Sequence, residues 1–256
     1  SDLFTMDITH QLISIFCEID DFCKELDNYF SGKLLTGPTK SQRGPECRLS
    51  ISEIMTILIL FQSTRFRDFK NFYQGFVSRY WHDYFPSLPS YARFIVLMKR
   101  VIFPMTLFTQ IKGGKRTGIY YIDSSCLPVC HLKRSKRHKT FDEIAEYGRT
   151  SVGWFFGLKL HIVINDRGEL LTFKVTRGHR SDCQEAQSLL TMLEGLAFGD
   201  KGYISKKLFD SLFQQGLKLI TRQRKNMKEV TRTAYEKQLL DLLIVQRFVQ
   251  RYDKMF

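Results

Sequence analysis

The chain lacks a long hydrophobic run and lacks paired CxxC cysteines. Its longest apolar stretch, Ile54 to Phe61, is far shorter than the ~20 residues that a membrane helix needs, so the sequence predicts no membrane span. The six cysteines are scattered, without the spacing of a zinc ribbon or a disulfide framework. Residues 1–7 lack the basic segment and long apolar segment of a secretion signal. We therefore expect a cytoplasmic protein with reduced thiols.

Acidic residues are scarce relative to basic ones. The chain has 39 Lys and Arg against 26 Asp and Glu, a formal net charge of +13. Such an excess favours a polyanionic partner, above all nucleic acid. The 256 residues, 43% of them hydrophobic, suffice for one large or two small domains. No internal repeat or low-complexity tract is present.

Residues 1–110 show the apolar spacing of helices, near 3.6 residues per turn. Ser50 and Glu53 have the spacing of a capping box, and Ser90 can cap a later helix. Helices of this number with short turns are typical of a helix-turn-helix unit or a small bundle, so we expect a helical DNA-binding region. The basic residues here fit a solvated helix face equally well. The expected helices are Thr5–Tyr29, a helix beginning at Ile54, Phe66–Val77 and Ala92–Arg100.

Residues 111–116 form the best candidate linker, and the pattern beyond them changes to strands. We expect residues 117–256 to fold as three strands in a meander, then helix, strand, helix, strand and helix. This order is that of an RNase H-like α/β fold, a mixed sheet flanked by helices in which the first and fourth strands are adjacent. The expected strands are Gly118–Val129, Trp154–Asn165, Leu170–Val175, Leu196–Asp200 and Leu217–Ile220.

Two apolar runs, each expected to be a strand, end in an aspartate, Asp123 and Asp200. Either residue alone fits a simple turn position equally well. On neighbouring strands, however, the two carboxylates could share Mg²⁺ or Mn²⁺, because hard cations take oxygen ligands. Bound ions of this kind activate water and stabilise a leaving oxygen on phosphorus. The pair therefore predicts a metal site that faces a polyanion.

Basic residues lie close to the first of these acids in the sequence. The run from Leu132 to Lys139 is the densest positive block and favours phosphate binding over a merely solvated loop. Alternation along the second strand predicts that Lys159 and His161 lie on its polar face. There they either point at a phosphate or are ordinary exposed residues. The candidate DNA-binding residues are Lys133, Arg134, Lys136, Arg137, His138, Lys139, Lys159, His161 and Lys201.

Several segments of the sequence resemble bacterial insertion-sequence transposases, and the resemblance covers nearly all of residues 5–228. Together these motifs are specific, although none is so alone. In the first half they are Leu49–Thr56, Arg67–Tyr73 and Phe85–Phe94. In the second half, similar to the DDE catalytic domain, they are Tyr121–Ser124, His138–Phe141, Gly153–His161 and Phe198–Tyr203.

The resemblance implies an RNase H-like fold, Mg²⁺ or Mn²⁺ as cofactor, and cleavage and strand transfer of double-stranded DNA at insertion-sequence ends and targets. It also implies Asp123 and Asp200 as the first two metal-binding acids. Proteins of this family usually act as homo-oligomers, which the resemblance implies here, although no residue marks an interface.

The third acid departs from the family pattern. The family carries a glutamate on its final helix, and the matching position here falls on Gln246 or Arg247, neither of which is acidic. The tail from Leu239 to Phe256 differs from the family, which indicates a divergent or truncated C-terminus. The nearest substitute is Glu236, our candidate for the third catalytic acid.

Three other functions stay open at this point. A catalytically impaired transposase remnant would bind DNA without cutting it, as the missing glutamate suggests. A helix-turn-helix regulator would need only residues 1–110, and that fragment alone would then keep the full affinity for DNA. An RNase H-like nuclease would cut without preference for element ends.

Overall fold

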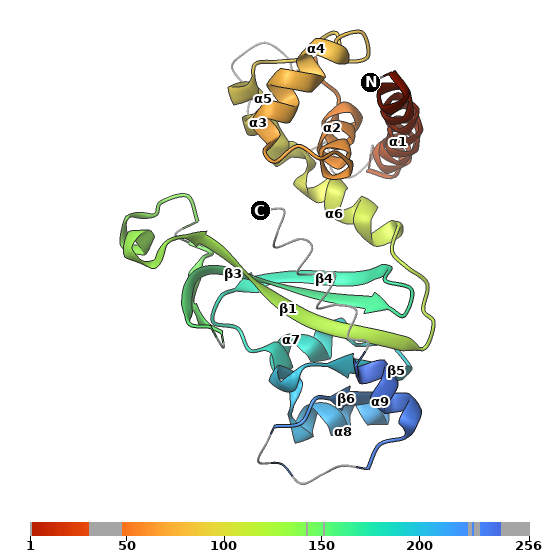
Figure 1. Cartoon of the computed structure of the whole chain (residues 1–256), viewed down its shortest axis with the longest axis vertical. Coiled ribbons are helices and arrows are strands. Elements are labelled where there is room, and N and C mark those ends of the chain that lie inside the picture. The colour runs from red at the N-terminus through yellow and green to blue at the C-terminus, as the bar shows by residue number, and fades with distance from the viewer. Residues whose placement is uncertain are drawn as a thin grey trace. The chain divides into compact units, whose positions relative to one another are not determined.

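The computed structural model describes residues 2–30, 48–141, 143–150, 152–224, 227 and 231–241. The chain divides into two compact units, Ser1–Lys112 and Gly113–Phe256, shown in Figure 1 and described here one at a time. The division falls inside residues 111–116, where the sequence pattern changes from helices to strands.

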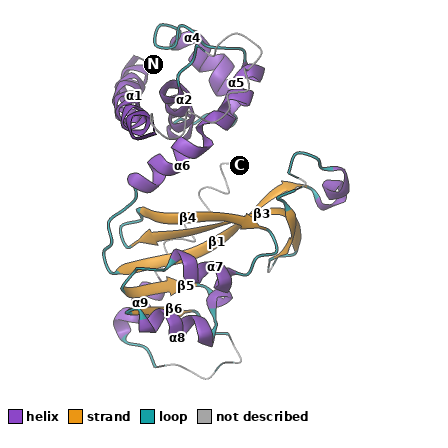
Figure 2. Cartoon of the chain, turned by 180° about the vertical axis from the view of Figure 1, so that it is seen from behind, coloured by secondary structure: helices purple, strands orange, loops and turns teal. Residues whose placement is uncertain are grey.

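Unit 1 is helical, as the periodicity of its apolar residues predicts (Figure 2). The chain also continues past Arg100 into a further helical segment that the sequence did not suggest. The elements are α1 (Asp2–Phe30), α2 (Ile51–Ser63), α3 (Phe69–Asn71), the π-helix η1 (Phe72–Val77), α4 (Ser78–Tyr80), α5 (Tyr91–Leu97), the 3₁₀ helix η2 (Met98–Val101) and α6 (Ile102–Ile111).

Polar side chains set the starts of these helices. The predicted capping box is confirmed: Ser50 accepts a hydrogen bond from the Glu53 backbone N–H, and the Glu53 carboxylate accepts one from the Ser50 backbone N–H. Asp68 caps α3 by accepting from the backbone N–H three residues on. That helix therefore begins at Phe69 rather than at Phe66.

The core of unit 1 is rich in aromatic rings. Helix α1 buries residues at helical spacing, among them Leu12 and Ile19, in a core shared with α2. Rings from the segment that holds η1 surround the fully buried Trp81, and Phe76 meets it edge-on with ring centroids 4.9 Å apart. Unit 1 thus has a hydrophobic core of its own.

One segment of unit 1 changes the expectation about membranes. Tyr91–Ile111, which comprises α5, η2 and α6, is long and apolar enough to cross a membrane by length and composition alone. Only 22% of its apolar window is buried in the structure. The sequence prediction missed this segment because Lys99 and Arg100 interrupt its apolar run. A single helix of this kind is weak support for a membrane span, since core helices of soluble proteins pass the same test.

Unit 2 is an α/β structure built on a six-stranded mixed sheet, and it confirms the expected RNase H-like class. The strand order is β2-β3-β1-β5-β6, with β4 also paired to β3. The strands are β1 (Ile119–Cys130), β2 (Glu146–Arg149), β3 (Trp154–Asn165), β4 (Leu170–Arg177), β5 (Gly195–Gly199) and β6 (Leu217–Thr221). The helices are η3 (Leu132–Arg137), α7 (Asp182–Leu189), η4 (Lys201–Tyr203), α8 (Lys206–Gln214) and α9 (Ala234–Asp241).

Helices cover both faces of this sheet. Alternate residues of β1 face opposite sides: Tyr120 and Ile122 pack in a cluster with α7 and α8, whereas Tyr121 packs in a cluster with α9. Figure 2 shows α7 and α8 on the near side of the sheet. Figures 1 and 2 both show the segment that holds η3 beyond the end of the sheet. This two-sided core fixes which side chains of β1 and β3 share a face.

The β3–β4 hairpin is confirmed, and its turn follows from local chemistry. Gly168 adopts a φ of +80°, which costs little only for a residue without Cβ. The Asn165 side-chain oxygen accepts hydrogen bonds from the Arg167 and Glu169 backbone N–H groups. Strand β2, which the sequence did not predict, is only four residues long and pairs with the first part of β3.

Candidate active site

Asp123 and Asp200 lie side by side on neighbouring strands. In the parallel pair of β1 and β5, Ile122 is the register partner of Gly199. Each aspartate is the residue that follows one of these partners in the chain. Adjacent strands are ~4.8 Å apart, so we expect the two acids to lie close together where the pairing of β1 with β5 ends. Both residues are half-buried. That the two carboxylates share one cation stays a prediction.

The two aspartates differ in their local setting. Asp200 directly follows β5 and is the N-cap residue of η4. Asp123, in contrast, lies within β1, which continues to Cys130. Its Oδ1 accepts a hydrogen bond from the Ser124 backbone N–H at 2.8 Å. The expectation that both strands end in an acid therefore holds only for β5.

The donor set of this pair fits a hard divalent cation. Mg²⁺ is commonly held by one or two carboxylates together with water and substrate phosphates. No group of three or more His, Cys, Asp or Glu in the described part of the chain is placed to hold a metal. The described residues therefore offer two protein ligands here, Asp123 and Asp200.

Glu236, the candidate third acid, is not brought to this pair. Its carboxylate lies 2.5 Å from Lys218 Nζ and accepts a hydrogen bond from the Thr233 backbone N–H, so it caps α9. Lys218 is the register partner of Leu196, and Asp200 lies four residues further along, or ~13 Å at the usual rise per residue. Hydrogen bonding from Lys218 lowers the pKa of Glu236. The other matching positions, Gln246 and Arg247, lie outside the described residues.

Lys159 and His161 do share one face of β3, but that face is not the exposed one we expected. His161 is fully buried, and its Nε2 lies 2.9 Å from Thr176 Oγ1. Burial lowers the pKa of His161, so its ring is neutral at pH 7. Lys159 is 12% exposed and pairs with Asp182 at 3.0 Å. Helix α7 covers this face, which the alternation of β3 alone could not reveal.

The basic block keeps its charges on the surface. Ser135 is its buried member; its hydroxyl donates to the Leu132 carbonyl and lies 2.5 Å from Tyr147 Oη. His138 is half-buried and stacks on Phe141. The exposed basic residues of the block are Lys133, Arg134, Lys136, Arg137 and Lys139. One buried serine therefore anchors a short helix, η3, that presents four of these cations, and Lys139 follows it.

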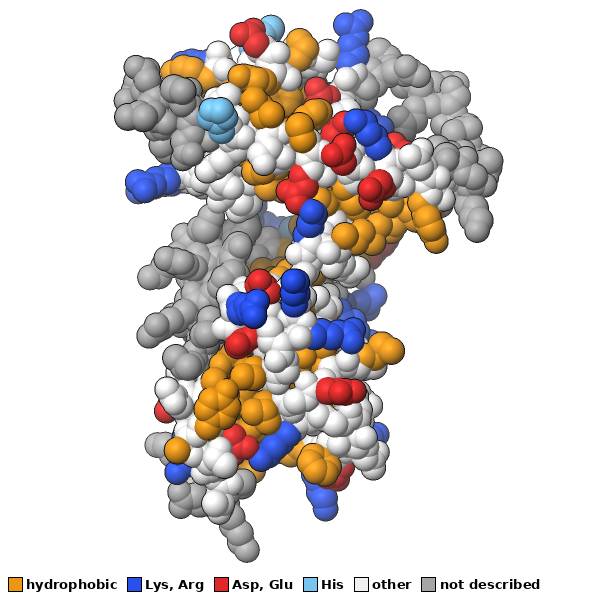
Figure 3. All heavy atoms as spheres, turned by 90° about the vertical axis from the view of Figure 1, so that its right-hand side faces the viewer, with side chains coloured by type: hydrophobic (Ala, Val, Ile, Leu, Met, Phe, Trp, Pro, Cys, Tyr) orange, Lys and Arg blue, Asp and Glu red, His pale blue; other side chains and the backbone are white. Residues whose placement is uncertain are grey.

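Lys201 is exposed and directly follows Asp200 at the start of η4. Its position next to the acid agrees with a phosphate contact, which stays a prediction. On the faces of the two units seen in Figure 3, described Lys and Arg side chains are interspersed with Asp and Glu. The net positive charge is therefore not gathered into one patch on those faces.

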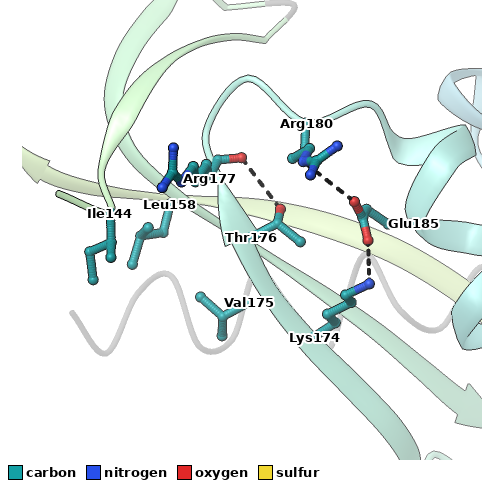
Figure 4. A pocket seen from close by; sticks show the side chains of 8 residues that line it. All are labelled: Ile144, Leu158, Lys174, Val175, Thr176, Arg177, Arg180 and Glu185. Atoms are coloured by element: carbon teal, nitrogen blue, oxygen red, sulfur yellow. Dashed lines mark hydrogen bonds and ion pairs between the residues drawn. The ribbon is translucent and has the colours of Figure 1, made fainter.

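A pocket of about 380 Å³ lies beside β4, apart from the pair of acids (Figure 4). Three of its lining residues, Lys174, Arg177 and Arg180, are cationic. Glu185 lies 2.6 Å from Lys174 and 3.9 Å from Arg180, and Glu146 pairs with Arg177 at 2.7 Å. Because each of these cations already pairs with a carboxylate of the same unit, the pocket is a weaker candidate for binding phosphate than the exposed basic block.

Comparison with known proteins identifies the class. The family model of the transposase DDE domain matches residues 113–251, more than half of the chain and almost all of unit 2. This chain belongs to that family, the DDE transposases. No curated protein matches it.

Among solved structures, this chain has a distant likeness to a piggyBac transposase in a synaptic complex with hairpin DNA. The match has 15% sequence identity and a TM-score of 0.35, and it covers 52% of this chain. It spans 28% of the piggyBac transposase chain.

Proposed function

We propose that this transposase cleaves DNA at the ends of an insertion sequence and joins the freed strand to target DNA. The observation that supports the proposal is the register of β1 and β5, in which Ile122 and Gly199, the residues before Asp123 and Asp200, are partners. Carboxylates so placed suit Mg²⁺ or Mn²⁺, which would activate water and neutralise charge on the scissile phosphate.

In this proposal the chain itself binds and orients the DNA. The five exposed cations around η3 bind backbone phosphates, which positions the duplex without reading its sequence. Lys201 adds a cation beside Asp200. The helices of unit 1 are the candidate for recognising the element ends, and a multimer would bring two ends together.

A nicking assay on supercoiled plasmid DNA with Mg²⁺ or Mn²⁺ tests the proposal. We expect nicking by the unaltered chain and none by Asp123→Ala. Asp210→Asn is a matched control, since Asp210 is an exposed acid on α8. Nicking that survives Asp123→Ala would rule out the proposed active site.

A second function is favoured by one observation. The described residues supply only two acids to the site, because Glu236 caps α9 instead. With only two acids, the chain would be a transposase remnant that binds DNA without cutting it. In the same assay it would shift plasmid DNA on a gel yet leave the DNA unnicked with either metal.

A further inference from the structure

A half-buried carboxylate, Asp182, contacts the chain segments next to the proposed metal site. It is the first residue of α7. Its Oδ1 accepts hydrogen bonds from Ser124 Oγ at 2.9 Å and from Lys159 Nζ at 3.0 Å. Lys159 also donates to the Arg180 carbonyl, so Asp182 and Lys159 tie α7 to both β1 and β3.

Asp182 also touches the turn that follows Asp200. A Cβ at Gly202 would lie 3.0 Å from Asp182 Oδ2, so the backbone of η4 packs closely against this carboxylate. The next residue of α7, Cys183, donates from Sγ to the Gly202 carbonyl at 3.1 Å. The start of α7 therefore contacts both chain segments that carry the acids.

These contacts lie on the opposite face of the sheet from the Asp123 side chain. Ser124 and His161 are register partners and share one face, whereas Asp123 shares the other with Ile162. His161 Nδ1 lies 3.8 Å from Asp182 Oδ1, too far for a hydrogen bond, and has no hydrogen-bond partner in the described structure. The Asp182 side chain is only 22% exposed, and Lys159 compensates its charge at 3.0 Å.

We propose that Asp182 is a positioning residue, which fixes the backbone at Asp123 and Asp200 so that the two carboxylates converge on one cation. This inference rests on the proposed metal site and adds a residue that does not itself bind the metal. It acts through Ser124 on β1 and through Gly202 on the turn after β5. Groups that orient metal ligands commonly change metal affinity 10- to 100-fold when they are replaced.

Direct Mn²⁺ binding by the full chain, measured by calorimetry, tests this role independently of DNA cutting. We expect Asp182→Asn to raise the Kd for Mn²⁺ about 10-fold or more, because the charge that holds Lys159 is lost. Thermal unfolding of the same samples reports the stability of each variant. Ser124→Ala removes one link to β1 with little change in volume and should raise the Kd about fivefold.

Glu185→Gln is the matched control. Glu185 lies on the same helix and is buried, but it pairs with Lys174 and Arg180 at the β4 pocket (Figure 4). Glu185→Gln should lower the melting temperature yet leave the Kd for Mn²⁺ within about twofold of the unaltered chain.

Each outcome decides between the two proposals. If Asp182→Asn and Ser124→Ala bind Mn²⁺ like the unaltered chain while Asp123→Asn abolishes binding, the metal site stands and the positioning role is wrong. Equal weakening by Glu185→Gln would also overturn the positioning role, since any loosening of α7 would then suffice. If the unaltered chain binds no Mn²⁺, the proposed metal site falls, and the positioning role with it.

Discussion

Ile122 and Gly199 are register partners in the parallel pair of β1 and β5. The pairing of the two strands ends with these residues, and the next residue in the chain after each of them is an aspartate. This relationship converts two separate apolar motifs into one candidate metal site, and it carries the proposed function.

If Asp123 and Asp200 share one cation, their contributions to metal binding are not additive. We expect Asp123→Asn and Asp200→Asn each to weaken Mn²⁺ binding by at least about 100-fold, with little further loss in the double variant, because either change dismantles the same site. Calorimetric titration of the three variants measures this. Additive losses in the double variant would mean that the acids bind separate ions.

The basic block should give DNA binding a strong dependence on salt. Replacing its five exposed Lys and Arg residues with Ala should weaken binding to any sequence and reduce the slope of log K against log salt by up to about 4.5, since each phosphate contact contributes about 0.9. Fluorescence anisotropy at several salt concentrations measures the slope. Lys206→Ala with Lys207→Ala, two exposed cations on α8, is the control, and an equal fall in its slope would show a nonspecific effect of charge.

The pair of Glu236 with Lys218 should make stability depend on pH. Lys218 lowers the pKa of Glu236 below its usual 4.5, so the pair stabilises the folded state above that pH. This contribution is lost as the pH falls through the lowered pKa. Urea unfolding between pH 3 and pH 7 should therefore show a smaller difference between the unaltered chain and Glu236→Gln at the acidic end.

The same glutamate separates a capping role from a catalytic one. Glutamine can still accept from the Thr233 backbone N–H, so Glu236→Gln should keep the helix cap, whereas Glu236→Ala should cost about 1 kcal/mol of unfolding free energy. Neither variant should change the Kd for Mn²⁺. A weakened metal affinity in Glu236→Gln would restore this residue as a ligand.

Gly157 should not tolerate a side chain. A Cβ there would lie 2.1 Å from the Leu127 carbonyl oxygen, in the pairing of β3 with β1. Because backbone would have to move, Gly157→Ala should lower the free energy of unfolding by about 3 kcal/mol. Gly75→Ala, where nothing lies within 4 Å of the new Cβ, should be neutral or slightly stabilising. Chemical unfolding of both variants checks the contrast.

Local patterns predicted most of the strands and helices. Alternation and apolar runs located β1, β3, β4, β5 and β6, and polar caps located α2 and α5. The sequence missed β2 because a four-residue strand carries too little pattern to be recognised. It placed the start of α3 too early because Asp68 was not recognised as its cap.

The sequence by itself determined the location of most strands, the basic block and the two aspartates, because each depends on residues near one another in the chain. Only the tertiary structure decided which charged groups meet. Helix α7 buries His161 and brings Asp182 to Ser124 and Lys159, and Lys218 holds Glu236 away from the acids. Those contacts join residues from separate elements, and their partners are set by how helices pack on a sheet rather than by spacing along the chain.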